Sequence, residues 1–437
     1  MKTSKILSCL ILFFTTGLLF VFSACEQEDD KISISDRQLH LFSESDAGFY
    51  NNSPTLVDSF IYIGTSRGKL YNIASDNAFY KLDKNLNKVW SYSLDSNEVI
   101  GSSALDKMGN IYFVVGENRT SYSYFTKFKL YSLSSDGSLK WTKTIWERTI
   151  EFSWIGINSP AISVDDIIYV GGDNFYAFDP DGNEKWKYPL NQNQNPFLNS
   201  PIIDTSGNIY FIHYADLISL DKNGVERWRA CDWANPFSSP AFSVDYDKIF
   251  YTTRFNGIYC VNSSDGSLIW EYAIPDITGD IRATPAVDDN NNIYIGSHGE
   301  DNEDTGQTLY AIKSDGSGLL WKNNLGSDLY SSPALGNDRI LYIGSEGYGK
   351  TSSNFNRLHA ISMLSGEIVW SAQLEMDITW SSAAISNDGT LYIASMDNYA
   401  EGRKGMIYSF KTTSTGLLSN TGSPRYHEGN KSTGRRE

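Results

Sequence analysis

The sequence has few cysteines and histidines, and fewer basic than acidic side chains. Its 437 residues include four Cys and five His, with 36 Lys and Arg against 52 Asp and Glu. Four cysteines are too few for a disulfide-built scaffold of this size. The formal net charge of −16 argues against a nucleic-acid partner, because that affinity depends on basic side chains that neutralise phosphates. The content of 41% apolar and 20% charged residues instead indicates a folded chain with a large core.

Helical periodicity is also absent after residue 24. No stretch there repeats apolar residues every 3.6 positions, so long amphipathic helices are not expected. Aromatic residues make up 14% of the chain, with 27 Tyr and 11 Trp, and these residue types favour strands. We therefore predict an all-β protein.

The one long apolar run lies at the N-terminus. A short basic start precedes the apolar residues 6–22, which are followed by Ser23, Ala24 and Cys25. The run is shorter than the ~20 residues that a membrane-spanning helix needs, and its order is typical of a secretory signal. The ending resembles a bacterial lipoprotein signal, which implies removal of residues 1–24 and acylation of Cys25. Cleavage elsewhere, or an uncleaved anchor, is the alternative.

An acidic segment follows Cys25. Residues 26–30 read Glu-Gln-Glu-Asp-Asp, and we interpret residues 25–37 as an acidic tether. The segment resembles the surface-export signal of lipoproteins from the Bacteroidetes group, and a plain soluble spacer is the alternative. Because the chain is acidic, lipid alone would hold it at a membrane. We expect a location at the bacterial outer membrane, on the periplasmic side or at the cell surface.

The rest of the chain is built from a repeat. Each unit contains a Ser-Pro-Ala-like opening, an Ile-Tyr-Ile-Gly-like run, a Leu-Tyr-Ala-Ile-like run, an Asp-Gly-like turn and a Trp. The repeat tryptophans are Trp90, Trp141, Trp186, Trp228, Trp270, Trp321 and Trp370. The openings begin at Ser53, Ser102, Ser159, Ser200, Ser239, Thr284, Ser332 and Ser382. The spacing of 42 to 51 residues between tryptophans is typical of a four-stranded propeller blade.

Eight openings predict an eight-bladed β-propeller of four-stranded antiparallel blades over residues 38–412, followed by a tail over 413–437. Turns such as Asp136-Gly137 join the predicted strands, because Gly accepts the positive φ of a tight hairpin. The eighth unit lacks its Trp strand. We expect residues 38–42 to supply this outermost strand and so close the ring, with residues 417–419 as the competing candidate.

The repeat resembles that of the pyrroloquinoline-quinone (PQQ)-like propellers, a family that includes quinoprotein dehydrogenases and the outer-membrane lipoprotein BamB. The tail from Ser423 to Arg435 also resembles the tail common in this family. Many of the dehydrogenases carry an adjacent Cys-Cys pair, which this chain lacks, along with the fuller Ala-x-Asp-x-x-Thr-Gly-Lys repeat. The resemblance therefore favours the BamB-like branch. We expect no cofactor, although PQQ and calcium are not excluded.

One face of the predicted ring carries longer connections. The gap between the second and third strand runs is short in blades three to five and long in blades six, seven, eight, one and two. These five blades are neighbours in a closed ring, so we expect a loop-rich binding face. Four tryptophans outside the repeat pattern are placed in connections on this face, although each could instead plug a neighbouring blade: Trp146, Trp154, Trp233 and Trp380.

The residue two positions before each Ser-Pro-Ala-like opening is expected to surround the channel mouth on this face. Phe237, Arg282, Tyr330 and Trp380 are four of these residues. Arg282 could hold an anionic group by bidentate hydrogen bonds. The alternative is a plugged axle with Arg282 facing solvent.

Other candidate chemistry is weak. The acidic residues Glu300, Asp301, Glu303 and Asp304 could hold a calcium ion or form a solvated loop. The histidines have no partner at metal-ligand spacing, and we expect His359 to be a packed ring. A disulfide between Cys231 and Cys260 is left open.

The function that these features favour is a non-catalytic, lipid-anchored scaffold. It would bind a protein or a glycan through the loop-rich face. The first alternative is a BamB-like accessory of outer-membrane protein assembly, and the second is a PQQ-dependent dehydrogenase.

Overall fold

The computed structural model describes most of the chain after residue 37. The described residues are 38–44, 49, 52–66, 77–95, 97–117, 126–147, 159–191, 199–231, 238–253, 257–275, 280–298, 307–346, 356–376, 378, 380–396 and 405–435. Within these ranges all regular elements are β-strands, which confirms the all-β prediction. The same ranges contain no helix that is long and apolar enough to cross a membrane.

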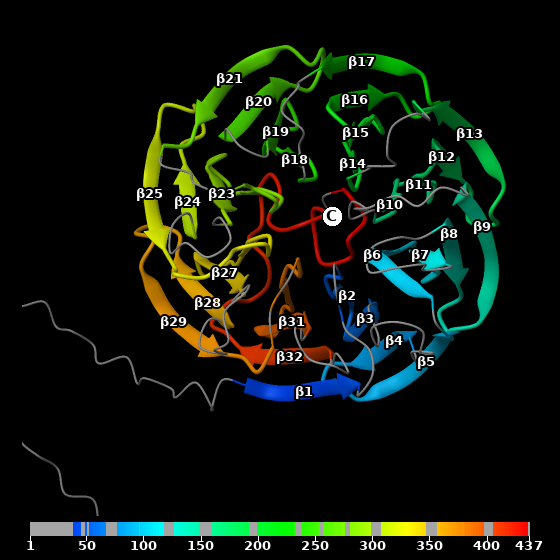
Figure 1. The fold of residues 1–437 in the computed structure, drawn as a ribbon, viewed down its shortest axis with the longest axis horizontal. Coiled ribbons are helices and arrows are strands. Elements are labelled where there is room, and N and C mark those ends of the chain that lie inside the picture. The colour runs from blue at the N-terminus through cyan, green and yellow to red at the C-terminus, as the bar shows by residue number, and fades with distance from the viewer. Residues whose placement is uncertain are drawn as a thin grey trace, which may run out of the picture. The chain divides into compact units, whose positions relative to one another are not determined.

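The strands form eight separate four-stranded antiparallel sheets, arranged as the blades of a ring (Figure 1). Blade one contains β2 (Thr55–Val57), β3 (Phe60–Gly64), β4 (Asn77–Asp83) and β5 (Lys88–Asp95). Blade two contains β6 (Glu98–Leu105), β7 (Ile111–Glu117), β8 (Lys127–Leu133) and β9 (Leu139–Glu147). Blade three contains β10 (Ala161–Ile162), β11 (Ile168–Gly171), β12 (Asn174–Phe178) and β13 (Glu184–Pro189). Blade four contains β14 (Ile202–Ile203), β15 (Ile209–His213), β16 (Asp216–Leu220) and β17 (Glu226–Cys231).

The second half of the ring repeats this pattern. Blade five contains β18 (Ala241–Phe242), β19 (Lys248–Thr253), β20 (Gly257–Asn262) and β21 (Leu268–Ala273). Blade six contains β22 (Ala286–Val287), β23 (Ile293–Gly296), β24 (Thr308–Ile312) and β25 (Leu319–Asn324). Blade seven contains β26 (Ala334–Leu335), β27 (Ile340–Ser345), β28 (Arg357–Ser362) and β29 (Ile368–Gln373). Blade eight contains β30 (Ala384–Ile385), β31 (Thr390–Met396), β32 (Gly405–Lys411) and the N-terminal β1 (Gln38–Glu44).

The ring is closed by the N-terminal strand, as predicted. β1 pairs antiparallel with β32, so the two ends of the propeller share one sheet. This closure joins the two ends of the chain's propeller in one blade and covers the outer edge of β32. The competing candidate, residues 417–419, does not take this place, because Leu417 bridges to Gly336 in blade seven.

The repeat tryptophans join each blade to the next. Trp186 of blade three packs against Gly224 in the β16–β17 turn of blade four, and its indole N–H donates to the Lys222 carbonyl oxygen at 3.0 Å. A Cβ on Gly224 would lie 2.6 Å from the indole, so the glycine leaves room for the ring. The same contact recurs for Trp90 with Gly137, Trp141 with Gly182, Trp228 with Gly266, Trp270 with Gly316, and Trp321 with Gly366.

The core lies between blades. One hydrophobic cluster combines side chains of β11 and β12 with side chains of β15 and β16. Within it, Phe175 and Phe211 stack at a centroid distance of 4.0 Å. Such face-to-face packing of neighbouring sheets buries apolar area that neither sheet could bury alone.

The Ser of the Ser-Pro-Ala opening forms a second ring of contacts around the axis. Its backbone N–H donates to the hydroxyl of the equivalent Ser or Thr in the next blade. Seven of these bonds, of 2.7–3.1 Å, run from Ser53 to Ser102, Ser102 to Ser159, Ser159 to Ser200, Ser200 to Ser239, Ser239 to Thr284, Thr284 to Ser332, and Ser382 to Ser53. Between blades seven and eight, the Ser331 hydroxyl donates to the Ser381 carbonyl oxygen instead. A hydroxyl can accept such a bond where Ala cannot, which explains why this motif recurs.

The C-terminal tail fills the centre of the ring (Figure 1). The innermost strands are short, and without the tail their channel-facing N–H groups would lack hydrogen-bond partners. The tail accepts from them in seven blades, namely from Leu56, Ile162, Ile203, Phe242, Val287, Leu335 and Ile385. Tyr426 contacts the hydroxyls of Ser159 and Ser200, and the Arg425 guanidinium donates to the carbonyl oxygens of Pro54 and Ser382. The tail therefore connects blades that are distant in sequence.

Candidate functional site

The two faces of the ring differ in the length of their connections. We call the face where second strands lead to third strands the upper face, and the opposite one the lower face. On the upper face, two or three residues separate these strands in blades three to five, and eight to twelve separate them in the other five blades. The predicted distribution of connection lengths is confirmed. Most residues of the long connections lie outside the described part of the chain.

A compact group of charged and aromatic side chains lies on the upper face at blades six to eight. We call it the rim cluster, and it consists of Asp280, Arg282, His298, Asp328, Tyr330, Glu346 and Trp380. Its members come from two kinds of position. Some precede the innermost strand of a blade, and the others, His298 and Glu346, follow the second strands β23 and β27.

Arg282 is paired within the chain. Its Nε lies 3.1 and 3.0 Å from the two carboxylate oxygens of Asp280, and its Nη2 donates to Oδ2 at 2.9 Å. The guanidinium also lies over the Tyr330 ring, 5.3 Å from the centroid. Arg282 therefore does not face solvent, although the plugged axle of the same interpretation is confirmed by the tail in the centre of the ring. That Arg282 holds an anionic group stays a prediction.

Tyr330 is the centre of an aromatic stack. Its ring lies 5.3 Å from Trp380 in a stacked arrangement and 4.6 Å from the imidazole of His298. Burial raises the pKa of Tyr330 well above its usual value, and the nearby Glu346, Asp328 and Asp280 carboxylates add to this rise. The phenol therefore stays protonated. The three carboxylates raise its pKa, and the Arg282 guanidinium lowers it.

His298 lies between two carboxylates. Its Nε2 lies 3.9 Å from Oδ1 of Asp280 in blade six, and its Nδ1 lies 3.4 Å from Oδ1 of Asp328 in the segment that leads into blade seven. The backbones of Asp328 and Glu346 exchange two hydrogen bonds of 3.0 Å. The cluster is thus fixed by backbone pairing as well as by side-chain contacts.

Trp380 is partly buried, while Tyr330 is buried. The backbone of Trp380 is left-handed, with φ of 63°. This conformation is a genuine outlier for a bulky residue and is maintained only where the surroundings fix it. In this backbone conformation the indole stacks on the Tyr330 ring.

Sequence reasoning found three members of the rim cluster and missed four. Arg282, Tyr330 and Trp380 were expected to meet at the channel mouth, and the structure brings them together. Alignment of the repeats would have revealed the others. Asp280 and Asp328 lie four positions before the openings of blades six and seven, and His298 and Glu346 lie two positions after the Gly that closes their second strands.

The prediction for Trp146 is wrong. It lies in β9 rather than in a connection, is 1% exposed, and packs against Phe128 at 4.9 Å. Its indole N–H has no hydrogen-bond partner among the described residues, and its ring packs in the core between blades two and three. The alternative, that this tryptophan plugs a neighbouring blade, is confirmed. Trp154, Trp233 and Phe237 lie outside the described residues, as do Glu300, Asp301, Glu303, Asp304 and Cys25.

Two smaller predictions are resolved by the described residues. His359 is 2% exposed, contacts the hydroxyls of Ser345 and Ser371, and has a pKa lowered by burial to about 4. It is a packed neutral ring, as expected. Cys260 is a free buried thiol, so the disulfide with Cys231 is not formed.

The expectation that the chain binds no PQQ or calcium stays a prediction. Among the described residues, no group of three or more His, Cys, Asp or Glu side chains is arranged to hold a metal ion. The chain also has no adjacent cysteines. We therefore derive no chemistry through that cofactor.

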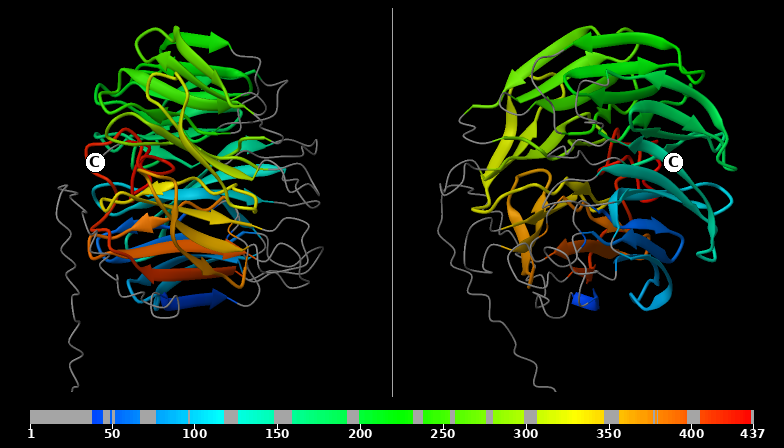
Figure 2. Two further views of the ribbon diagram at one scale, coloured as in Figure 1. Left: turned by 90° about the vertical axis from the view of Figure 1, so that its left-hand side faces the viewer. Right: turned by 45° about the vertical axis from the view of Figure 1, so that its right-hand side comes forward.

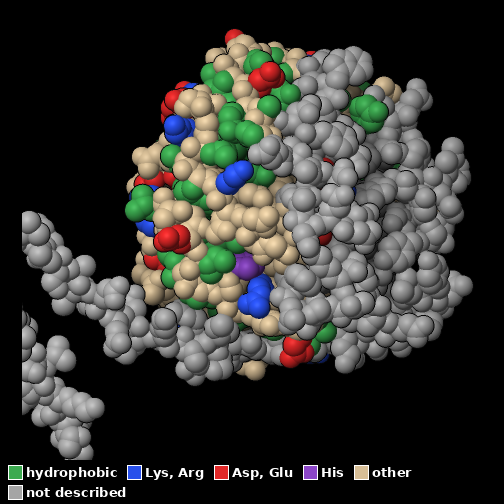
Figure 3. Space-filling view, turned by 60° about the vertical axis from the view of Figure 1, so that its left-hand side comes forward, with side chains coloured by type: hydrophobic (Ala, Val, Ile, Leu, Met, Phe, Trp, Pro, Cys, Tyr) green, Lys and Arg blue, Asp and Glu red, His purple; other side chains and the backbone are tan. Residues whose placement is uncertain are grey.

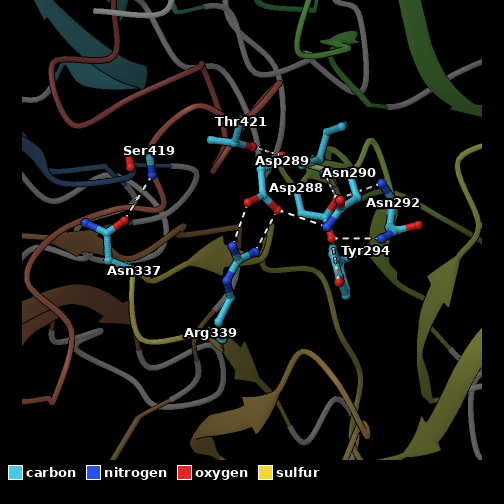
Figure 4. A network of polar contacts seen from close by, with 10 residues as sticks. Asp288, Asp289, Asn290, Asn292, Tyr294, Asn337, Arg339, Ser419 and Thr421 are labelled. Carbon is cyan, nitrogen blue, oxygen red and sulfur yellow. Dashed lines mark hydrogen bonds and ion pairs between the residues drawn. The ribbon is translucent and has the colours of Figure 1, made fainter.

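The lower face shows a different kind of polar network. Arg339 of blade seven donates to both carboxylate oxygens of Asp289 in blade six at 2.6 Å (Figure 4). Next to it, the Asp288 carboxylate accepts from the Tyr294 hydroxyl at 3.0 Å, and the tail residue Thr421 donates to the Val287 carbonyl oxygen. These contacts join two blades and the tail, so we assign the network a structural role.

In the view of Figure 3, the described part of the outer rim shows no broad apolar surface. Figure 3 shows hydrophobic side chains in separate groups among polar and charged ones. The side views in Figure 2 show the blades arranged around the axis of the ring. Residues such as Leu268, Ile269 and Val369 are about half exposed on the outermost strands. Scattered exposed side chains of this kind are ordinary and mark no site.

Comparison with known proteins places the chain in a family. The family model described as outer membrane protein assembly factor BamB matches residues 94–231, 213–304 and 277–407. The chain belongs to this family. It is a BamB-like member of the PQQ-like propellers, as its repeat predicted. No curated protein matches the sequence.

Solved structures share the fold at low sequence identity. BamB from Moraxella catarrhalis is 13% identical with a TM-score of 0.60, and the match covers 86% of this chain and 99% of that one. The quinohemoprotein alcohol dehydrogenase from Comamonas testosteroni is 12% identical with a TM-score of 0.62, covering 87% and 77%. A europium-containing methanol dehydrogenase is 12% identical with a TM-score of 0.57, covering 85% and 93%. These likenesses show the propeller alone, because proteins with and without enzyme activity share it.

Proposed function

We propose that this BamB-like propeller is a non-catalytic binding module that is anchored by lipid at the bacterial outer membrane. It engages a protein or a glycan through the upper face, at blades six to eight. The observation that carries the proposal is the rim cluster, because a stack of Arg282, Tyr330 and Trp380 lies where the long connections gather. Aromatic and Arg side chains held in this way are typical of interaction hot spots.

A role as an accessory of outer-membrane protein assembly is the specific version of this proposal. The match to the BamB family model supports it, since that model bears this description. No described residue identifies the assembly partner. The match to the BamB family model also supports a non-catalytic role over a PQQ-dependent one.

The binding role is tested with Trp380→Ala and Tyr214→Ala. Tyr214 lies on the same face in the β15–β16 turn of blade four and is 45% exposed, so it is a matched aromatic control away from the cluster. Each full-length variant is crosslinked in cells and its partners are identified by mass spectrometry. We expect Trp380→Ala to lose partners that Tyr214→Ala keeps. Retention of all partners by Trp380→Ala would contradict a binding role for this part of the face.

The lipid anchor is tested separately at Cys25. Mass spectrometry of the purified protein is expected to find an acylated N-terminal Cys25, and Cys25→Ser is expected to release the protein from membranes. Protease shaving of intact cells then distinguishes a cell-surface location from a periplasmic one. An unmodified Cys25 in a membrane-bound protein would overturn the anchor.

A further inference from the structure

We propose that residues 380–382, which lead into blade eight, form a latch with two positions that controls whether Trp380 stacks on Tyr330. In the position that the structure shows, the stack is formed. In the other position, Trp380 leaves Tyr330 and a hydrogen bond between blades seven and eight forms in its place. The inference rests on the proposed binding role of the upper face and adds a means of controlling that role.

The first observation is a missing bond between blades seven and eight. At the seven other junctions of the ring, the backbone N–H of an opening Ser or Thr donates to the hydroxyl of the next opening. Within the described ranges, no such bond joins Ser332 of blade seven to Ser382 of blade eight, and the buried Ser382 hydroxyl has no hydrogen-bond partner there. A buried hydroxyl in this condition is costly, so an arrangement that supplies a donor to Ser382 gains stability.

The second observation is that the rest of Ser382 is in its regular place. Its backbone N–H donates to the Ser53 hydroxyl at 2.9 Å, and its carbonyl oxygen accepts from the Arg425 guanidinium at 3.1 Å. Blade eight is therefore bonded normally to blade one and to the tail. Toward blade seven, the Ser331 hydroxyl donates to the Ser381 carbonyl oxygen at 2.6 Å instead. The departure from the repeat is confined to this one junction.

The third observation is the backbone of Trp380, two positions before Ser382. Its φ of 63° is left-handed, which is unfavourable for a bulky side chain. The strain and the unpartnered hydroxyl therefore lie in the same short segment. In this arrangement the Trp380 ring stacks on Tyr330 at 5.3 Å. The costs of the strain and of the hydroxyl are of the same order as the gain from a stacked aromatic pair, so two arrangements of the segment are close in free energy.

These observations define the second position of the latch. Trp380 takes an ordinary negative φ and leaves Tyr330, and the Ser382 hydroxyl accepts the Ser332 N–H. The ring of hydrogen bonds is then complete, but the stack is not formed. A partner that contacts the stacked indole binds only the first position, so it shifts the equilibrium toward that position. The apparent affinity for this partner is proportional to the fraction of molecules in the first position.

A double-mutant cycle tests the latch in the full-length protein. Ser382→Ala is made in the natural sequence and in a Trp380→Ala background, and urea unfolding measures the equilibrium constant for unfolding of each protein. Trp380→Ala removes the stack, so the second position is favoured in that background. Ser239→Ala in both backgrounds is the matched control, because the Ser239 hydroxyl accepts the Ser200 N–H at 3.1 Å at the junction of blades four and five.

We expect Ser382→Ala in the natural sequence to change the unfolding constant by less than about twofold, because its hydroxyl has no described partner to lose. In the Trp380→Ala background, the same substitution should raise the constant about fivefold, which corresponds to the loss of one hydrogen bond. Ser239→Ala should raise it by the same factor in both backgrounds. Equal effects of Ser382→Ala in the two backgrounds, whether small or large, would overturn the latch.

A second background keeps the test decisive. If Trp380→Ala does not fold, Trp380→Leu replaces it, because this variant also removes the stack but retains a large apolar side chain. The cycle needs no partner, so its result is separate from that of crosslinking in cells. If cellular partners depend on Trp380 and Ser382→Ala acts equally in both backgrounds, the proposed binding role survives and the latch is refuted. If the cycle behaves as expected and every partner is retained by Trp380→Ala, the latch survives and the binding role is refuted.

Discussion

Single residues explain why the repeat takes its form. The Trp of each unit needs a neighbour without a side chain, and Gly224 meets that need beneath Trp186. In seven of the eight openings the Ser or Thr needs its hydroxyl, because it accepts the backbone N–H of the preceding blade. Both requirements come from contacts between blades. The residue types that recur in the sequence therefore mark the positions where each blade contacts the next.

The tryptophan contact predicts a difference between two glycines. Gly224→Ala places a methyl group against the Trp186 indole at a residue with φ of 81°. Gly207→Ala meets the same φ penalty, with φ of 84°, but its nearest neighbour would be 3.6 Å away. We expect Gly207→Ala to lower the free energy of unfolding by about 1–2 kcal/mol from the left-handed backbone alone. Gly224→Ala should cost a further 1–3 kcal/mol, roughly, from overpacking. Urea unfolding of both variants measures the difference, and equal losses would show that the indole contact contributes nothing.

The buried imidazole of His359 predicts a dependence of stability on pH. Its pKa is lowered by burial to about 4, from 6.5 in the absence of burial. Between these values the unfolded chain binds a proton that the folded protein excludes, so stability falls as the pH is lowered from about 6.5 to about 4. His359→Gln removes this titrating group. The loss in free energy of unfolding between about pH 6.5 and about pH 4 should then be smaller by on the order of 3 kcal/mol. The cost of the substitution at pH 8 measures lost packing alone. Parallel profiles for the two proteins would contradict the assignment.

At the scale of elements, the sequence predicts the strands well and the connections poorly. The strands and the closing role of β1 follow from recurring residue types, which report local preference and burial. Trp146 was misplaced because β9 extends to Glu147, beyond the usual end of the fourth strand. Asp280 was missed because its bond to Arg282 depends on side-chain direction in an irregular segment. An alignment of the repeats places Asp280 at the position equivalent to Asp328, but it does not give the direction of a side chain.

The tail acts as one further element and predicts a graded loss of stability. Tyr426→Phe removes one hydroxyl from between Ser159 and Ser200 and should lower the free energy of unfolding by about 1 kcal/mol. Deletion of residues 413–437 removes the bonds to seven blades and should cost several times as much. Thr415→Ala is the control within the tail, because Thr415 is exposed. Chemical denaturation checks the series, and a tail deletion as stable as the intact chain would refute its role in closing the channel.

At the scale of the whole molecule, the repeated units form a ring whose upper face is asymmetric. Blades three to five have short connections on the upper face, and the neighbouring five blades have long ones. The rim cluster lies within this longer arc, at blades six to eight. The sequence could predict the arc, because connection lengths can be counted. It could not predict the cluster, because His298 and Asp328 meet only once blades six and seven pack together.

The most direct test of this account is photo-crosslinking in cells from three positions on the full-length protein. A photoreactive phenylalanine derivative, which keeps an aromatic ring at the position, replaces Trp380 on the upper face at blade eight, Tyr214 on the upper face at blade four, or Leu364 in the β28–β29 turn of the lower face. Tyr214 and Leu364 are 45% and 91% exposed, so both can reach a partner if one is present. We predict a discrete crosslinked partner from the Trp380 position and none from the other two. Crosslinks from Leu364 alone, or equally from all three positions, would contradict a binding face at blades six to eight.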